Sequence, residues 1–144
     1  MKRHQALEAL SRDHHHALVV ARRLTRADSE ASEAAARAFL AFWRCEGQAH
    51  FRLEEEVLLP VYAAHGDPNH PVVLQTLVDH MVIRRDALSI AEGPAVEVLI
   101  ALGVQLAAHV RLEERQLFPL IERAMPDDAL RAVARRLGAD TDRT

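Results

Sequence analysis

Residues 50–60 read HFRLEEEVLLP, and residues 109–119 read HVRLEERQLFP. Both segments follow the pattern His-x-x-Leu-Glu-Glu-x-x-Leu-x-Pro, late in a long stretch with helical periodicity. Residues four apart on a helix project from the same face. The first histidine and first glutamate of each segment therefore present an imidazole and a carboxylate toward one point. These pairs are His50 with Glu54 and His109 with Glu113.

A second, shorter match precedes each of these segments. Residues 13–24 read DHHHALVVARRL and residues 79–88 read DHMVIRRDAL, so both begin with an Asp-His pair. His14 and His80 each interrupt a stripe of apolar residues spaced three or four apart, which is the pattern of a core-facing helix. The chain is therefore a duplicated helical hairpin, and each half supplies one lone histidine and one His-x-x-x-Glu pair.

The periodicity predicts four long helices and a short fifth one that ends at Gly138. Breaker residues mark a loop at 65–71, and Glu92-Gly93-Pro94 ends the third helix. Four amphipathic helices joined by short loops are typical of an antiparallel up-down-up-down bundle. We therefore expect an all-α fold in one domain over residues 1–144, with hairpin repeats at about 4–64 and 71–124. The expected helices cover about residues 3–26, 29–64, 71–91, 95–124 and 127–137.

Composition excludes several classes of function. The 144 residues carry a net charge of -3 with both signs mixed along the chain, so no extended basic face for nucleic acid is expected. The single cysteine, Cys45, can form neither an internal disulfide nor a zinc-thiolate cluster. No apolar run reaches the length of a membrane helix or a signal segment, so we expect a cytoplasmic protein without a membrane partner.

Nine histidines are the unusual feature of the composition. If the four apolar stripes face the bundle axis, six candidate ligands converge there: His14, His50, Glu54, His80, His109 and Glu113. A core histidine is more often hydrogen-bonded than metal-bound, and each glutamate has its own histidine as an alternative partner. Two carboxylates on core faces nevertheless favour a metal, because a buried unpaired charge costs several kcal/mol.

The ligand set favours two metal ions. Two carboxylates can bridge two cations, and a mixture of imidazole and carboxylate suits iron or manganese. Zinc accepts the same ligand types but is usually bound as one tetrahedral ion with fewer ligands. We therefore expect two non-haem iron ions, in preference to manganese or zinc.

These segments resemble the hemerythrin-like, or HHE cation-binding, domains over about residues 4 to 124. The resemblance implies a non-haem di-iron centre, in which His14, His80, His50 and His109 match the family's histidines and Glu54 and Glu113 its bridging carboxylates. Two departures concern the oxygen-carrying members. They have a second histidine where this chain has Arg84, and an aspartate five residues after the last histidine where this chain has Glu113 at four. The departures indicate the broader HHE branch rather than an oxygen carrier.

Some residues beside the candidate ligands have alternative roles. His15, about 100° round the helix from His14, is a candidate fifth nitrogen ligand. Glu46, one turn before His50, is a candidate third carboxylate, and Gln105 holds the matching place before His109. Glu55 and Glu114 lie a third of a turn off the ligand face, so we expect them to be solvated.

Three functions fit these observations. The first is a binding protein that carries or responds to a small ligand (O2, NO or peroxide) or that senses or stores iron. The second is an enzyme, an iron-dependent oxidoreductase such as a peroxidase. The third is a scaffold bundle with a vestigial site. The sequence shows no nucleotide motif or evident substrate pocket, which favours binding over catalysis.

Overall fold

The structure is a computed structural model that describes residues 2–141, and all regular elements in that range are helical. The α-helices are α1 (Glu8–Thr25), α2 (Ser32–Phe42), α3 (Gln48–Leu53), α4 (Leu59–Ala63), α5 (Pro71–Ala91), α6 (Val96–Leu112), α7 (Phe118–Ala124) and α8 (Asp127–Thr141). A 3-10 turn, Gln5–Leu7, precedes α1. Three π-helical turns, Trp43–Gly47, Glu54–Leu58 and Glu113–Leu117, link α2 to α3, α3 to α4 and α6 to α7.

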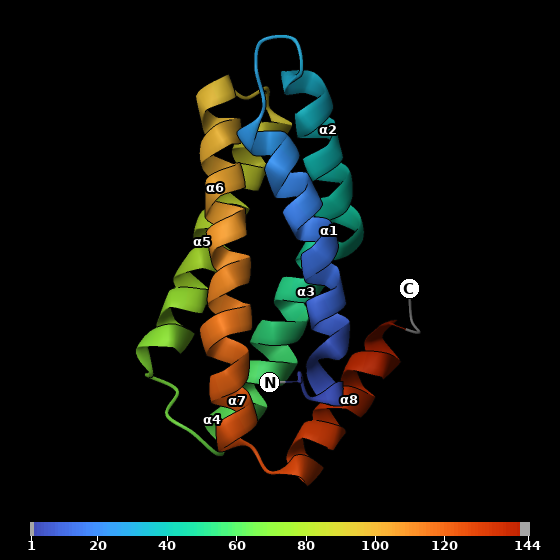
Figure 1. The fold of residues 1–144 in the computed structure, drawn as a ribbon, viewed down its shortest axis with the longest axis vertical. Coiled ribbons are helices and arrows are strands. Elements are labelled where there is room, and N and C mark those ends of the chain that lie inside the picture. The colour runs from blue at the N-terminus through green and yellow to red at the C-terminus, as the bar shows by residue number, and fades with distance from the viewer. Residues whose placement is uncertain (1, 142–144) are drawn as a thin grey trace.

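The helices form a bundle, as the sequence predicted (Figure 1). α1 and α5 each pack against both α2 and α6, so the neighbours close into a ring. In Figure 1 the chain rises along α1, descends along α2 to α4, rises along α5 and descends along α6 and α7. α8 then folds back beside the lower end of α1. The chain thus forms four helical runs, which are α1, α2 to α4, α5, and α6 with α7. Each run presents one face to a common interior.

Three predicted helix ends were wrong. The first helix, expected from about residue 3, begins at Glu8 after the 3-10 turn Gln5–Leu7. The second helix begins at Ser32 rather than at residue 29, because the Asp28 carboxylate accepts hydrogen bonds from the N–H groups of Glu30 and Ala31 and holds a turn there. α8 continues through Gly138 to Thr141. A glycine ends a helix when it takes a left-handed conformation. Among the described residues, only Gly93 has a positive φ, at 100° just after the end of α5.

The two repeats share an unusual backbone feature at the candidate glutamates. The N–H of Leu59 donates to the carbonyl of Glu54, five residues back, and the N–H of Phe118 donates likewise to Glu113. A proline follows each of these donors, at 60 and 119. Because proline has no N–H and crowds the carbonyl four residues earlier, a widened turn accommodates it better than a regular α-helix.

A layer of polar residues divides the hydrophobic core into two clusters. One cluster includes Phe39, Trp43, Phe51, Ile83 and Leu102. The other includes Leu10, Leu58, Leu117, Phe118 and Ile121. Between them lie eight buried polar or charged residues: His14, His50, Glu54, Thr76, Asp79, His80, His109 and Glu113. Apolar packing on both sides therefore holds the polar layer in place and limits its contact with solvent.

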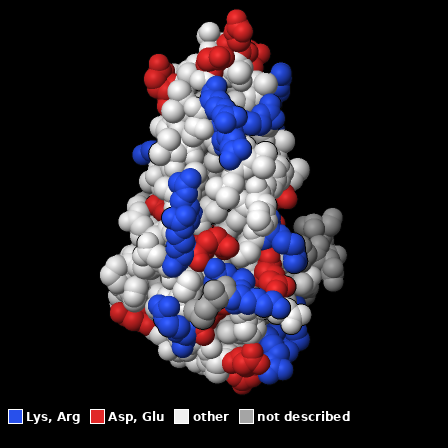
Figure 2. Space-filling model, viewed as in Figure 1, with Lys and Arg blue, Asp and Glu red and all other residues white. Residues whose placement is uncertain are grey.

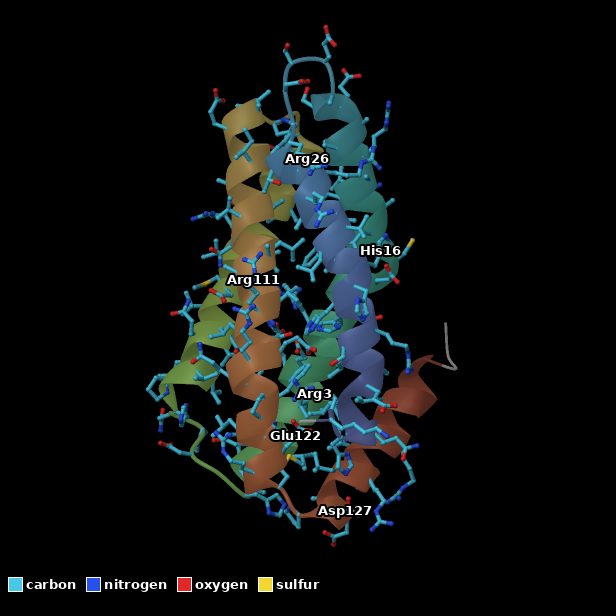
Figure 3. All side chains as sticks on the ribbon, in the orientation of Figure 1. Arg3, His16, Arg26, Arg111, Glu122 and Asp127 are labelled. Carbon is cyan, nitrogen blue, oxygen red and sulfur yellow. The ribbon has the colours of Figure 1, made fainter. Side chains whose placement is uncertain are left out.

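The N-terminal segment closes the lower end of the bundle (Figure 3). Arg3 forms an ion pair with Glu122, whose carboxylate also accepts a hydrogen bond of 2.6 Å from the backbone N–H of His4. The His4 ring lies 2.8 Å from Asp127. These contacts fix the start of α1 against α7 and α8.

The surface adds little that points to a function. On the face shown in Figure 2, Lys and Arg side chains are interspersed with acidic and uncharged residues. Among the described residues, no helix combines the length and the hydropathy that crossing a bilayer requires.

The contact between α1 and α6 depends on Gly103. A Cβ atom at this position would lie 2.7 Å from the carbonyl oxygen of Ala21 and 2.8 Å from Cβ of Leu24. We therefore expect Gly103→Ala to lower the free energy of unfolding by about 1–3 kcal/mol, although alanine is the better helix former. Urea denaturation of the metal-free protein measures this change. Gly138→Ala is the control, because its added Cβ meets no atom within 4 Å, and it should not destabilise the protein. A Gly103→Ala protein as stable as the original would contradict the close packing.

Candidate metal centre

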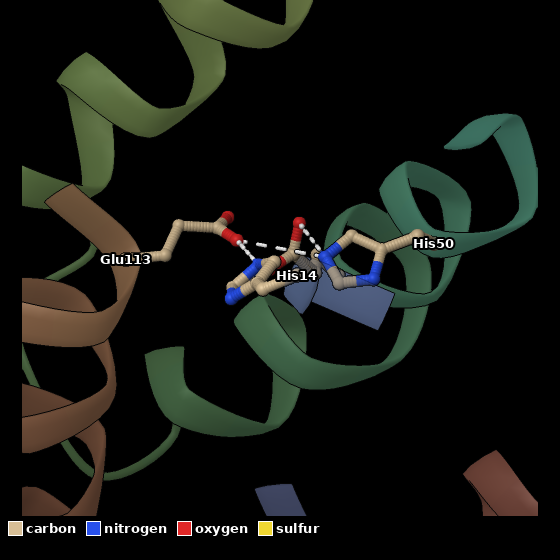
Figure 4. Close-up of side chains that lie close together, drawn as sticks. His14, His50 and Glu113 are labelled. Atoms are coloured by element: carbon tan, nitrogen blue, oxygen red, sulfur yellow. Dashed lines mark hydrogen bonds and ion pairs between the residues drawn. The ribbon is translucent and has the colours of Figure 1, made fainter. Parts of the chain in front are cut away.

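The six predicted ligands lie together in the polar layer, and each is at most 5% exposed. Every helical run contributes to the cluster: His14 from α1, His50 from α3, Glu54 from the following π-turn, His80 from α5, His109 from α6 and Glu113 from the π-turn after it. Figure 4 shows how His14, His50 and Glu113 point toward one another from three separate elements. The bundle thus brings all six predicted side chains to one place.

The cluster consists of two groups of four residues that share both glutamates. One group is His14, His50, Glu54 and Glu113, and the other is Glu54, His80, His109 and Glu113. Within each group the candidate ligand atoms all lie within 4.8 Å of one another. The geometry therefore offers two adjacent cation positions, each with two imidazoles and a share of two carboxylates.

Distances from the Nε2 atoms place each histidine against the glutamates. His14 Nε2 lies 2.8 Å from Glu113 Oε1, and His109 Nε2 lies 3.2 Å from Glu113 Oε2. His80 Nε2 lies 3.2 Å from Glu54 Oε1. His50 Nε2 lies 3.4 Å from the same Glu54 oxygen and 3.5 Å from Glu113 Oε1.

Unpaired polar atoms show that this cluster fits a metal better than an ordinary core. Six buried atoms of the cluster have no hydrogen-bond partner: Nε2 of His50, His80 and His109, both carboxylate oxygens of Glu54, and Oε2 of Glu113. Buried polar atoms in native proteins are nearly always paired. All six are donor atoms for iron, manganese or zinc, so cations between them would satisfy the whole set.

A second ring of carboxylates holds the outward nitrogens of the four histidines. The Nδ1 atom of His14 lies 3.2 Å from Glu114, that of His50 3.0 Å from Asp13, that of His80 2.7 Å from Glu55, and that of His109 3.0 Å from Asp79. A carboxylate on the far nitrogen fixes the orientation of a metal-binding imidazole and makes it a stronger ligand. Each ring is therefore aimed with Nε2 toward the centre.

The expectation that Glu55 and Glu114 are solvated was wrong. The structure pairs each of them with a histidine on another helix, across the bundle. The sequence feature that could have indicated this role is the repetition of the second glutamate in both Leu-Glu-Glu segments. Arg84, at the position where oxygen carriers have a further histidine, also bonds to Glu55, with two contacts of 3.1 Å.

Neither of the additional candidate ligands joins the cluster. The His15 side chain is exposed, because one residue after His14 the surface of α1 faces solvent. Glu46 forms a short contact with His16, whose ring also lies 5.3 Å from the ring of Phe42 at the end of α2 (Figure 3). Gln105, at the place that matches Glu46, instead donates a 3.0 Å hydrogen bond to Asp79.

Mutual charge compensation shifts the pKa values of the cluster. Burial alone would lower the pKa of His109, but the charge of the nearby Glu113 carboxylate and the hydrogen bond to Asp79 outweigh it and raise the value to about 10. Burial is likewise outweighed at His80, where the nearby carboxylates of Glu113 and Glu54 raise the pKa to about 9. The pKa of Glu113 lies well below its usual range, because His109 and the other histidines outweigh the effect of burial. The raised pKa values of the histidines and the lowered pKa of Glu113 thus both favour the charged forms of these side chains in the metal-free protein.

This compensation predicts opposite pH dependences for folding and for metal binding. The folded-state pKa values of His80 and His109, about 9 and about 10, exceed the usual value of 6.5. Their contribution to the stability of the metal-free protein is therefore complete below about pH 6.5 and is lost as the pH rises through 9 and 10. Metal binding needs neutral imidazole, so its affinity should rise over the same range.

Thermal unfolding of the metal-free and the metal-loaded protein between about pH 6.5 and pH 9.5 tests both trends. The melting temperature of the metal-free protein should fall with pH while the gap between the two forms widens. A gap that stays constant would contradict the competition between protons and metal.

The comparisons with known proteins agree with this geometry. The model of the hemerythrin HHE cation-binding domain matches residues 5–121, which include all six clustered side chains. No curated protein and no solved structure matches the chain. The resemblance seen in the two repeated segments is confirmed, and the chain belongs to the hemerythrin HHE cation-binding domain family.

Proposed function

We propose that the protein holds two non-haem iron ions and binds a small ligand, either a diatomic gas (O2 or NO) or peroxide. The observation that carries this proposal is that two pairs of histidines share two fully buried carboxylates. Histidine and carboxylate ligands with positions left open are typical of non-haem iron proteins. Sensing or storage of iron by the same centre is the variant of this proposal in which the metal itself is the signal.

Different side chains of the site would have different roles in holding the metal ions. Glu54 and Glu113 would hold the two metal positions next to each other, since each carboxylate faces both pairs of histidines. The outer carboxylates keep the imidazoles oriented. Two iron ions, when bound, would supply exchange of electrons with a small ligand. The apolar clusters on both sides of the layer keep water out.

A small cavity beside the centre supports the choice of a small ligand. Its volume is about 20 Å³, enough for roughly one water-sized molecule. His14, His50 and His109 line it together with apolar side chains that include Ala17, Trp43 and Leu106. A ligand with more than a few atoms would not fit without movement of these side chains.

A second candidate function is an iron-dependent oxidoreductase such as a peroxidase. The observation in its favour is that two acidic residues, Asp13 and Glu46, are among the residues around the cavity. Carboxylates next to a reacting ligand can accept or deliver protons. Consumption of peroxide over many turnovers in the presence of a reductant would favour the enzyme, whereas reversible binding of O2 or NO would favour the binding protein.

Metal content tests the assignment of the glutamates. The iron-reconstituted protein should contain about two irons per chain and show near-ultraviolet bands that change on anaerobic reduction. Replacing both bridging glutamates, with Glu54→Gln and Glu113→Gln, should reduce the iron content to below one per chain, because neutral amides are poor iron ligands. Glu56→Gln is the control, since Glu56 is exposed beside the site. Unchanged iron content in the double variant would show that the bundle is a scaffold with a vestigial site.

Filling the cavity tests the route of the small ligand. Ala17 is buried on α1 and lines the cavity. Ala17→Leu should slow the binding of NO to the reduced protein by about tenfold or more, while about two irons per chain remain. Stopped-flow absorbance measures the rate, and Ala108→Leu at an exposed position on α6 is the control. Equal rates in both variants would exclude this cavity as the ligand site.

A further inference from the structure

The two metal positions look equivalent in the sequence, yet their surroundings differ. The inner ligands match between the repeats: His14 with His80, His50 with His109 and Glu54 with Glu113. The outer carboxylates also match, Asp13 with Asp79 and Glu55 with Glu114. What differs is the set of side chains that hold these outer carboxylates.

Asp79 is held much more firmly than Asp13. Its side chain is 8% exposed and accepts hydrogen bonds of 2.7 Å from Gln75 and 3.0 Å from Gln105 in addition to its contact with His109. The Asp13 side chain is 37% exposed, and within the described part of the chain its one hydrogen bond is to His50.

The sequence explains this difference. The residues of the first half that match Gln75 and Gln105 are Ala9 and Glu46. Alanine has no amide to donate, and Glu46 is turned toward His16. Only the second half therefore supplies amide donors to its outer aspartate.

The outer glutamates differ in the same direction. Arg84 binds both carboxylate oxygens of Glu55 at 3.1 Å, and its guanidinium lies over the rings of Trp43 and Phe51. Glu114 is instead bonded to the neutral hydroxyl of Ser11, at 2.8 and 3.1 Å. Both contacts to Glu55 come from one guanidinium nitrogen, Nη2, and a charged donor of this kind makes a stronger hydrogen bond than a neutral hydroxyl.

The imidazoles themselves follow this pattern. The His80 ring stacks on Phe51 with 3.8 Å between ring centroids and an angle of 7°. The nearest stacking partner of His14 is Phe118, at 5.6 Å. The small cavity adjoins His14, His50 and His109, and His80 does not line it. The His80 ring is thus packed more closely than the His14 ring before any metal arrives.

From these differences we infer that the two positions bind metal unequally, with the His80–His109 position filled first and more tightly than the His14–His50 position. A side chain that is already oriented loses less conformational freedom when it binds a metal. A preorganised site therefore binds the metal with higher affinity. This inference rests on the proposed metal function. It implies a half-loaded state with metal between His80 and His109, and a second position whose occupancy follows the metal concentration.

Arg84 would then be a positioning residue for the tight position. Its side-chain hydrogen bonds go to Glu55, which in turn holds Nδ1 of His80. Arg84 would therefore act on His80 through Glu55. Arg85, its neighbour, is 70% exposed and pairs with Asp86, so it offers a matched control on the same helix.

Anaerobic titration of the metal-free protein with Fe(II), followed by calorimetry and by competition with a chelator, tests the order of filling. The original protein should show two steps of one iron each, separated by about tenfold or more in affinity. Asp79→Asn should weaken the first step by about 10–100-fold, and Asp13→Asn should weaken the second step alone. Arg84→Gln should weaken the first step and leave the second unchanged, while Arg85→Gln should alter neither.

Each other result has a definite meaning. Two equal steps, or a first step weakened by Asp13→Asn rather than by Asp79→Asn, would overturn the inference while the proposed di-iron function stands. Failure of the original protein to bind Fe(II) at all would overturn the proposed function itself. The Arg84 side chain is 35% exposed, so we expect the Arg84→Gln protein to fold. It can therefore test the inference even if an aspartate variant does not fold.

Discussion

The burial of two carboxylates at the centre of the bundle is the constraint on which the rest of the structure depends. Glu54 and Glu113 are fully buried. Removing charges from water costs several kcal/mol each unless they are compensated. The four histidines lie against these carboxylates, their pKa values are raised in the metal-free protein, and they would be neutral ligands around cations in the loaded one. Each helix must therefore be long enough to build apolar packing above and below this layer, which explains why the core has two clusters.

The backbone is adapted to the same layer in both halves of the chain. The His-x-x-x-Glu spacing places an imidazole and a carboxylate on one helix face. A π-turn begins at each glutamate, and a proline follows six residues later. π-turns are frequent at functional sites because they change the direction of the side chains that follow. Here the residue after each glutamate, Glu55 or Glu114, reaches a histidine on a different helix.

The sequence was sufficient for the inward faces but not for the contacts between neighbouring helices. His14 and His80 could be placed because each interrupts an apolar stripe, and a stripe identifies the face of its own helix that is buried. His15 and Glu55 each lie one residue after an inner ligand, about 100° round the helix, and periodicity treats them alike. In the structure His15 faces solvent, whereas Glu55 meets His80 on α5. Tertiary packing decides which neighbouring helix, if any, contacts such a position. The periodicity of a single helix does not contain this information.

The duplication separates two properties that are usually linked in a metal site. Both halves keep the same inner side chains, so two metal positions built from them would share their preference among metals, which depends on donor type and number. The differences lie one layer further out. When the two repeats are aligned, Gln75 and Arg84 of the second half match Ala9 and Leu18 of the first. Changes there leave the donor atoms intact and alter how firmly they are held. A duplicated bundle can therefore make its two positions unequal in strength without changing which metal they select.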